Sequence, residues 1–570
     1  MSNDKDAARP GRIPPTRIPG TGARRLGARV VDPGGAHRGQ GRRAPEPTAY
    51  VGDVLLIPGL RGLSADPAIE ELRSMAEAKG YTLDFVPEDN SIAFARKKGL
   101  AKEVDAIAHT AVHLVPMDED GDAADAWPMV EQVRARRDRR REETRNKRAA
   151  EKQGSKPTSD ESSGRQEPAL PKDVLDGVGL AHVMTASGWG DGIGWGDGIG
   201  WGDGIGWGDG IGWGDGIGWG DGISGPRGRV PVVWSADPPE PTSEDGPVVA
   251  TLDTGLGTHK WFPEGPRAER HPKKSTGLPL GVTFPPGSDP EGTGVTLDKV
   301  NGRLDPLAGH GTFIAGIVRQ HCPNARILSV PVMWGDGVAD ELDVVRALTG
   351  LYVRQLSATQ PSGDPTQVID VLTLSLGYRH ETPGQFDDEE ALFRVLRGLA
   401  RLGVTIVAAV GNNASDVEFF PAAYASKVAA DSSNATDVAP MMSVGALNPD
   451  RRTVSIYSNT GGWVQYYRAA TSVVSTMPTS FNASSRGALL QQSAPGVVAP
   501  AIPTRGAVDS DDFSGGFGLW SGTSFAAPAL AGDIAAGLHK ADPAPKDVSA
   551  RSARAHAALA EALKPAKVGS

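Results

Sequence analysis

The sequence predicts an α/β protein: a mostly parallel sheet with helices on both faces, in three layers, preceded by a small ferredoxin-like α+β domain. From residue 225 onward, apolar strand-like runs alternate with amphipathic helical segments, an order typical of parallel sheets. Polar residues stand where several of these runs end, which is where ligands bind in such sheets. Between residues 49 and 117 the patterns follow the order β-α-β-β-α-β, which is that of a ferredoxin-like domain.

The first half of the chain divides into segments of different composition. Residues 1–48 are rich in Arg, Pro and Gly without apolar periodicity, and they are predicted to be a disordered basic arm. Residues 118–187 are predicted to form a charged, solvated helix followed by a flexible linker. In the ferredoxin-like segment 49–117, strands are expected at VGDVLLIPG, YTLDFVPE, SIAFARKK and VHLVPM, and helices at DPAIEELRSMAEAKG and LAKEVDAIAHTA.

Residues 188–224 hold six copies of the hexapeptide Trp-Gly-Asp-Gly-Ile-Gly, the last of which ends in Ser224 instead of glycine. Glycine at every second position makes ordering of the backbone costly, and few side chains are available to offset that cost by burial. A hexapeptide β-helix needs about three such units per coil, so the repeat makes roughly two coils, too few for a stable stack. We therefore predict an inserted surface segment; a metal-binding or self-associating role is the alternative.

Overall composition bears on partners and compartment. The 570 residues carry 59 Lys and Arg against 69 Asp and Glu, a net charge of −10, which gives no electrostatic reason to expect nucleic acid. We find no membrane-spanning run and no apolar core of a secretory signal near the start. The single cysteine, Cys322, allows no internal disulfide. The sequence predicts a soluble cytoplasmic protein without nucleic-acid or membrane partners; export by another route and the oligomeric state stay open.

The second half is predicted to be one domain over residues 225–545, with residues 546–570 as a C-terminal tail. Its strand PVVATLDTG runs to Asp253, the strand in VIDVLTLSLG ends at Ser375, and VTIVAAVGNN ends at Asn412. Between them come a helix that begins at His310, the strand ARILSVPVM, and the helix DDEEALFRVLRGLARLG. Because the carboxyl ends of parallel strands meet at one edge of a sheet, a site is expected there.

Four short blocks carry a resemblance to a known family. They are Asp-Thr-Gly at 253–255, Gly-His-Gly-Thr at 309–312, Gly-Asn at 411–412 and Gly-Thr-Ser-Phe-Ala-Ala-Pro at 522–528. In this order they resemble the signature blocks of subtilisin-like serine peptidases, and subtilisin itself carries its triad in the order Asp, His, Ser. The resemblance covers roughly residues 230–538. It implies a serine endopeptidase that cuts polypeptides bound in extended form.

The resemblance also implies a role for each matching residue. Ser524 would be the nucleophile, His310 the general base and later the general acid, and Asp253 the carboxylate that orients the imidazole. The side-chain amide of Asn412 and the backbone N–H of Ser524 would bind the oxyanion, and the amide contact is worth about 3–4 kcal/mol in subtilisin itself. Taken singly, these residues also suit turns, helix caps or structural contacts; the peptidase hypothesis depends on their occurrence together.

The resemblance extends to substrate binding and to the first domain. Ser375, Leu376 and Gly377 match the segment that pairs with the extended substrate backbone. Catalysis would need no cofactor, no residue spacing demands a metal, and structural calcium is left open. Segment 49–117 resembles a propeptide that covers the active site, although a long spacer follows it. The alternative function is a catalytically silent binding or scaffold protein of subtilisin fold, held closed by its N-terminal domain.

Overall fold

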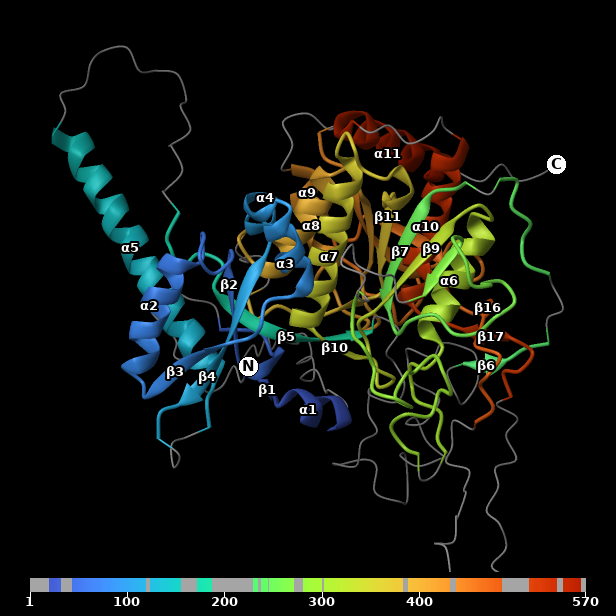
Figure 1. Ribbon diagram of the computed structural model, residues 1–570, viewed down its shortest axis with the longest axis horizontal. Coiled ribbons are helices and arrows are strands. Elements are labelled where there is room, and N and C mark those ends of the chain that lie inside the picture. The colour runs from blue at the N-terminus through green and yellow to red at the C-terminus, as the bar shows by residue number, and fades with distance from the viewer. Residues whose placement is uncertain are drawn as a thin grey trace, which may run out of the picture.

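The computed structural model divides into an N-terminal part and a larger α/β part (Figure 1). The hexapeptide repeat at 188–224 lies outside the described residues, so the prediction of a surface insertion stays a prediction. Among the helices that the structure describes, none combines the length and apolar character that a bilayer-spanning segment needs. The described residues are 20–31, 44–118, 123–154, 172–186, 229–233, 237–243, 245–270, 280–299, 302–382, 388–430, 437–483, 512–540 and 547–564.

The larger part is built on a seven-stranded sheet in the order β15-β14-β13-β11-β7-β9-β8, and every neighbouring pair is parallel. All residues of the central strands β7, β11 and β13 are buried, as expected for a sheet covered on both faces. The strands are β7 (Val248–Asp253), β8 (Ala268–Arg270), β9 (Arg326–Pro331), β11 (Val371–Leu374), β13 (Thr405–Ala409), β14 (Met441–Leu447) and β15 (Tyr466–Ala469).

Helices cover the two faces of this sheet. Helices α6 (His310–His321) and α10 (Thr523–Lys540) lie on one face, and α7 (Glu341–Thr359) and α8 (Ala391–Arg401) on the other (Figure 1). The predicted three-layer α/β/α architecture is therefore confirmed. The short α9 (Ala425–Ala430) follows the 3-10 turn η2 (Ala422–Tyr424), and a second 3-10 turn, η1 (Pro365–Gln367), follows α7.

Two further elements complete the larger part. Helix α11 (Val548–Ala562) packs on α10, so the predicted C-terminal tail carries a helix of the fold. A small antiparallel sheet in the order β16-β17-β6 lies at the edge and leads directly into α10. Its strands are β6 (Val230–Pro231), β16 (Val473–Thr476) and β17 (Phe517–Trp520).

The N-terminal part has an antiparallel sheet in the order β5-β2-β4-β3, crossed on one face by α2 (Asp66–Glu77) and α5 (Ala126–Gly154). Side chains of both helices share one apolar core with β2 and β4. Four antiparallel strands with two crossover helices are a ferredoxin-like arrangement, in agreement with the predicted fold class. The strands are β2 (Ala49–Pro58), β3 (Tyr81–Phe85), β4 (His109–Pro116) and β5 (Gly179–Ala186).

The sequence assigned two of these elements wrongly. SIAFARKK, predicted as a strand, lies in α3 (Asn90–Lys97): the carboxylate of Asp89 accepts a hydrogen bond from the backbone N–H of Ser91 and so caps the helix. Helix α4 (Ala101–Asp105) ends earlier than predicted, and β4 begins inside the predicted helix. The last strand of the ferredoxin-like sheet is β5, in the stretch for which the sequence predicted a linker.

Part of the predicted disordered arm is ordered. Helix α1 (Gly20–Leu26) and strand β1 (Ala28–Val30) lie within residues 1–48, and β1 pairs antiparallel with β2. The guanidinium of Arg25 lies 2.9 Å from the buried carboxylate of Asp336 in the larger part. For residues 20–31 the expectation of disorder is wrong, because pairing and a charge contact with distant segments hold them in place.

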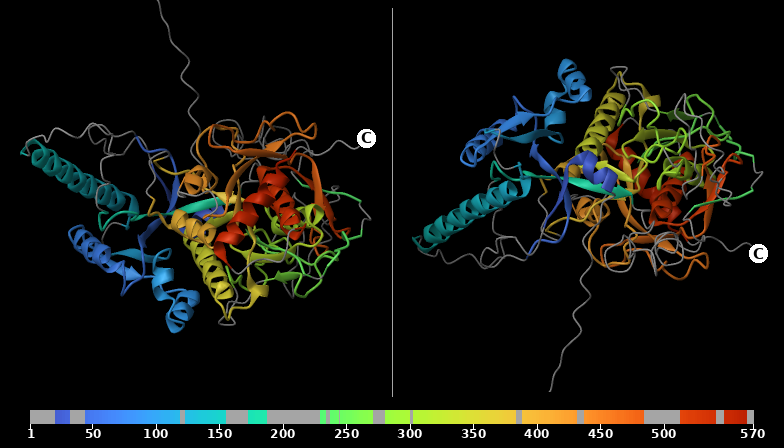
Figure 2. Two further views of the ribbon diagram at one scale, coloured as in Figure 1. Left: turned by 90° about the horizontal axis from the view of Figure 1, so that it is seen from above. Right: turned by 90° about the horizontal axis from the view of Figure 1, so that it is seen from below.

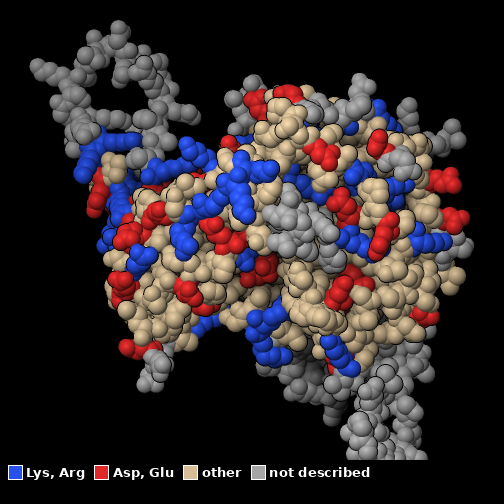
Figure 3. Space-filling view, viewed as in Figure 1, with Lys and Arg blue, Asp and Glu red and all other residues tan. Residues whose placement is uncertain are grey.

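Lys and Arg side chains gather along α5, at the left of Figure 3. Several are paired within their own domain: Arg140 lies 2.6 Å from Glu71 on α2, and Arg141 lies 2.6 Å from Asp176. The basic excess of this helix therefore helps to join α5 to the rest of the N-terminal part, as well as facing solvent.

Strand β5 belongs to both parts of the molecule. Beyond its pairing with β2, it runs antiparallel to β10 (Val338–Asp340) and to β12 (Leu376–Gly377) of the larger part. Its last residue, Ala186, pairs with Leu376. The two further views in Figure 2 show this strand running from the N-terminal part into the body of the molecule. The N-terminal domain is thus joined to the α/β domain by a continuous sheet.

Candidate active site

Asp253 and His310 meet at the carboxyl edge of the parallel sheet. Asp253 is the last residue of β7 and His310 the first residue of α6, and both are buried. The Nδ1 atom of His310 lies 2.7 Å from Oδ1 of Asp253, and the backbone N–H of Thr254 donates to the same oxygen at 2.8 Å. The imidazole is therefore fixed through Nδ1, which leaves its Nε2 directed elsewhere.

Ser524 lies near the start of α10, the helix that packs on α6. The ring of the following residue, Phe525, packs 5.5 Å from the ring of His310, and the Ser524 side chain is fully buried. Within the described chain, neither the Ser524 hydroxyl nor Nε2 of His310 has a hydrogen-bond partner. The start of α10 thus contacts the ring of His310 through Phe525, and within the described residues no hydrogen bond joins Ser524 to His310.

Asn412, which follows β13, contacts the same helix start. Its Oδ1 accepts a hydrogen bond from the backbone N–H of Thr523 at 2.9 Å, while the Thr523 hydroxyl accepts one from Gly411 at 3.2 Å. Because the amide oxygen of Asn412 already accepts this hydrogen bond, only its Nδ2 remains as a donor. This Nδ2 is buried and has no partner among the described residues. Buried donors without partners are uncommon in folded proteins. An amide donor is therefore left available next to Ser524.

Comparison with known proteins identifies the family. The model of the subtilase family matches residues 244–569, more than half of the chain. This chain belongs to the subtilase family. A thermophilic serine proteinase of Bacillus sp. (strain AK1) is 29% identical over 192 residues, which cover 32% of this chain and 39% of that protein. The chain thus matches about two fifths of the length of this curated relative.

Two solved structures are also similar to this subtilase over about half of its length. A cold adapted subtilisin-like serine proteinase is 19% identical, with a TM-score of 0.31, and the match covers 55% of this chain and 84% of that one. A lanthipeptide protease is 18% identical, with a TM-score of 0.30, and the match covers 51% and 73% of the two chains.

A buried carboxylate that the sequence analysis missed lies behind the Asp253–His310 pair of this subtilase. Glu291 accepts a hydrogen bond from the Thr312 hydroxyl at 2.6 Å and from the backbone N–H of Gly311 at 3.1 Å. It also contacts the Thr254 hydroxyl, which lies 3.1 Å from Oδ1 of Asp253. Glu291 therefore holds the threonines of the Asp-Thr-Gly and Gly-His-Gly-Thr blocks against one another.

The environment of Glu291 changes its acidity. Burial raises its pKa to about 7, and the nearby negative charges of Asp289 and Asp253 act in the same direction, against the hydrogen bonds from the threonines. No spacing or motif in the sequence distinguishes this glutamate. The only hint is chemical: two threonine hydroxyls in adjacent buried blocks need an acceptor.

Asn459 was also missed, and it shapes the loop that carries Asn412. Its Oδ1 accepts hydrogen bonds from the backbone N–H groups of Asn413 and Ser415 at 3.0 and 3.1 Å, and its Nδ2 donates to the carbonyl of Val410 at 2.8 Å. One side chain thus fixes the backbone on both sides of Asn412. Its position 47 residues further along the chain hides this contact from any local motif.

The predicted substrate segment is paired with the protein's own chain. Ser375 follows β11 and its hydroxyl donates to the carbonyl of Ser524 at 2.9 Å, while Leu376 and Gly377 form β12 and pair with β5. A side chain at position 377 would place its Cβ 2.2 Å from the carbonyl oxygen of Phe420, so glycine is required there. Ala186, the last residue of β5, therefore pairs with the residue that directly follows Ser375.

Proposed function

We propose that this subtilase is a serine endopeptidase that acts through Asp253, His310 and Ser524 and an acyl-enzyme intermediate. The observation that supports it best is the buried contact between His310 Nδ1 and Asp253, while Nε2 of the same ring and the Ser524 hydroxyl both lack partners among the described residues. Leaving two polar atoms buried without a bond is costly unless another group completes the site. In the proposed reaction, the scissile carbonyl of a bound peptide is the group that completes the site.

The proton transfers follow from the hydrogen bonds. With its Nδ1–H donated to Asp253, the imidazole of His310 keeps a lone pair on Nε2, and this accepts the proton of the Ser524 hydroxyl as the oxygen attacks the scissile carbonyl. The imidazolium is stabilised by the buried carboxylate and then gives the proton to the leaving amine. Water repeats the sequence to hydrolyse the acyl-enzyme. Glu291, in this account, positions Asp253 and the start of α6 without touching substrate.

Charge on the carbonyl oxygen would be stabilised at the start of α10. The Nδ2 of Asn412 and the backbone N–H of Ser524 are the two donors. Support for Asn412 comes from the use of its oxygen by Thr523, because this hydrogen bond fixes which end of the amide is free to donate.

We propose that polypeptide substrates bind in extended form along Ser375–Gly377. Strand β5 supports this, because it pairs with that segment through the backbone, as an added substrate strand would. Main-chain pairing tolerates varied side chains. The N-terminal domain, through β5, would then act as a propeptide-like inhibitor, and the peptide bonds that follow Ala186 are the nearest candidates for self-cleavage.

The same pairing of β5 with β12 favours one second candidate, a catalytically silent subtilisin-fold protein that β5 keeps closed. The two functions differ in what Ser524→Ala changes. If the chain is a peptidase, purified wild type shortens to a product that begins after Ala186 and degrades casein, whereas Ser524→Ala stays at full length and inactive. If the two proteins stay equally intact and equally inactive, also after removal of residues 49–186, the silent candidate replaces the proposal.

A further inference from the structure

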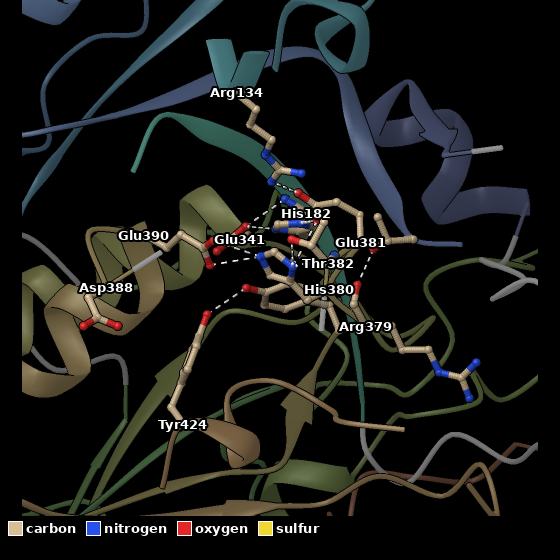
Figure 4. A network of polar contacts seen from close by, with 12 residues as sticks. Arg134, His182, Glu341, Arg379, His380, Glu381, Thr382, Asp388, Glu390 and Tyr424 are labelled. Atoms are coloured by element: carbon tan, nitrogen blue, oxygen red, sulfur yellow. Dashed lines mark hydrogen bonds and ion pairs between the residues drawn. The ribbon is translucent and has the colours of Figure 1, made fainter. Parts of the chain in front are cut away.

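A second buried cluster of ionisable side chains lies where the N-terminal domain meets the α/β domain (Figure 4). We call it the junction cluster. It draws on β5, on the chain after β12, on the starts of α7 and α8, and on α5. It comprises His182, His380, Glu381, Glu341, Glu390 and Arg134.

His182, on β5, is held between two carboxylates. Its Nδ1 lies 2.7 Å from Oε2 of Glu341, which also accepts the backbone N–H of His182 at 2.8 Å. Its Nε2 lies 2.9 Å from Oε2 of Glu381. Its ring stacks on that of Tyr378, with the ring centroids 4.1 Å apart, and the residue is 4% exposed. The orientation of the imidazole is thus fixed, with one nitrogen on each carboxylate.

His380 has the same arrangement in reverse. Its Nε2 lies 3.0 Å from both carboxylate oxygens of Glu390, while its Nδ1 lies 3.6 Å from Oε2 of Glu381 and accepts the backbone N–H of Thr382 at 2.9 Å. Each histidine therefore has one nitrogen on an outer carboxylate and the other directed toward Glu381. Histidines that bind metal ions almost always donate their second ring N–H to a carboxylate or carbonyl in this way.

The spacing of the three inner groups suits a small metal ion. Ligand atoms of His182, His380 and Glu381 lie within 4.8 Å of one another. For tetrahedral bonds of roughly 2.0–2.1 Å, two ligand atoms stand about 3.3 Å apart. The contacts of Glu381 Oε2 with His182 Nε2, at 2.9 Å, and with His380 Nδ1, at 3.6 Å, lie on either side of that value. Small side-chain shifts would bring the three groups to bonding geometry.

The charges of the cluster also call for added positive charge. Three carboxylates face one guanidinium, that of Arg134, which contacts Glu381 from α5. The side chains of Glu341 and Glu381 are 3% and 1% exposed. If both imidazoles are neutral, two negative charges remain in a buried environment, which is strongly unfavourable. Protons on both histidines or one divalent cation would neutralise them.

We propose that His182, His380 and Glu381 bind one divalent transition-metal ion of the zinc class, with Glu341 and Glu390 as the outer carboxylates. Two imidazoles and one carboxylate are a ligand set of Zn²⁺ sites. Because His182 comes from β5 and the other two ligands follow β12, the ion would hold the N-terminal domain to the α/β domain. His380 would give up its hydrogen bond from Thr382. The site is independent of the chemistry proposed for Ser524.

The test uses the full-length chain with Ser524→Ala, freed of metal by a chelator and then titrated with Co²⁺. The proposal predicts one equivalent bound, with the strong visible absorption of tetrahedral Co²⁺, and displacement by one equivalent of Zn²⁺. Elemental analysis after gel filtration should find one zinc per chain. A chain that retains no metal, or that shows only the weak absorption of hydrated Co²⁺, would overturn the proposal.

Variants locate the site. His182→Ala and His380→Ala should abolish the absorption, whereas Glu390→Gln, which alters an outer carboxylate, should weaken Co²⁺ affinity about 10–100-fold. The matched control is His113→Ala, a histidine of the same domain that contacts Asp53 at 2.9 Å and is absent from the cluster. Each variant is compared with its own metal-free sample by the shift of the unfolding midpoint on adding Zn²⁺, which cancels any folding defect.

Metal binding that His182→Ala and His380→Ala leave intact would place the ion elsewhere and end the proposal. If neither histidine variant folds, Glu390→Gln still decides: unchanged Co²⁺ affinity in that variant contradicts the assignment, and a loss of 10-fold or more supports it.

Discussion

The two buried polar centres of this protein differ in how completely their atoms are bonded. In the active site, Nε2 of His310, the hydroxyl of Ser524 and Nδ2 of Asn412 are buried without partners in the described chain. In the junction cluster, both ring nitrogens of His182 and of His380 face polar groups within 3.0 Å. Polar atoms left unbonded indicate a place for a substrate group, whereas the junction-cluster histidines and carboxylates contact one another directly when no metal ion is bound. The active site is prepared for a substrate, and the junction cluster joins two domains.

One short segment connects the two centres. Ser375 donates to the carbonyl of Ser524, and six residues later Glu381 contacts His182. Between them, β12 pairs with the end of β5. Changes at the active site should therefore alter chemistry and spare stability, while changes in the junction cluster should do the reverse.

The largest effect is expected for Ser524→Ala. The activity should fall on the order of 10⁶-fold in kcat, the loss known for the nucleophile of subtilisin itself. Because the Ser524 hydroxyl makes no hydrogen bond in the described structure, the unfolding midpoint should stay close to that of wild type. Peptide hydrolysis and thermal unfolding of the same preparations measure both. A variant that keeps its activity, or that unfolds at a much lower temperature, would contradict the claim that changes at the active site alter chemistry and spare stability.

His182→Ala should loosen the N-terminal domain, when measured without added metal. Removing the imidazole takes one partner from each of the buried carboxylates of Glu341 and Glu381; Glu381 keeps its contact with Arg134, and Glu341 keeps the backbone N–H of residue 182. The cost should therefore stay below the roughly 3–5 kcal/mol of a buried charge left with no partner. Hydrogen exchange of the β5 amides should accelerate correspondingly. His113→Ala, in a half-exposed pair with Asp53, should change β5 exchange little. Equal protection of β5 in both variants would show that the junction cluster does not hold the domains together.

Asn412→Ala should lower kcat about 10²–10³-fold with a small change in KM, because its amide donor acts on charge that develops in the transition state. This magnitude is that of the equivalent subtilisin residue. The matched control is Asn413→Ala, since the neighbouring Asn413 is exposed. If both variants keep wild-type kcat, the unpartnered Nδ2 of Asn412 has no catalytic role.

Glu291→Gln should change how stability depends on pH. The pKa of Glu291 is raised by burial to about 7 from 4.5, so the folded protein binds the proton more tightly than the unfolded chain. Its contribution to stability is complete below about pH 4.5 and is lost as the pH rises through 7, an effect of about 3 kcal/mol. The variant should therefore gain stability relative to wild type between pH 5 and pH 8. Parallel unfolding midpoints across that range would refute the ionisation of Glu291.

The sequence alone was sufficient for the parallel sheet, and its candidate residues include the pair Asp253–His310 and Asn412, which contacts the start of α10. Strands β7, β11 and β13 are apolar throughout because both faces are covered, and the polar residues at their ends stand out against that background. The candidate site residues could be named from the sequence because each lies in a recognisable block; they are Asp253, His310, Ser524 and Asn412. Glu291 and Asn459 escaped detection, since their contacts are made across long stretches of chain by residues without local pattern.

The N-terminal domain was harder to predict for a physical reason. Strand β5 pairs with β2 on one side and with β10 and β12 on the other, more than 120 residues before and more than 150 after it in the chain. Nothing near Gly179–Ala186 encodes those partners. Helix α3 shows the second difficulty. In a short stretch of alanine and mixed apolar residues, the periods of two and of 3.6 residues are hard to distinguish. The hydrogen bond by which Asp89 caps the first turn favours the helix over a strand. The members of the junction cluster likewise come from five separate segments.

The most direct test of the account is labelling of the purified chain with a fluorophosphonate, which reacts only with an activated serine. A site for a specific protease placed directly after Ala186 allows the N-terminal domain to be removed on demand. We predict slow labelling of chains that are still uncut, fast labelling of Ser524 once residues 1–186 have left, and none in Ser524→Ala. Absence of label in the trimmed wild-type protein, or label that persists in Ser524→Ala, would contradict the claim that Asp253, His310 and Ser524 form a working triad.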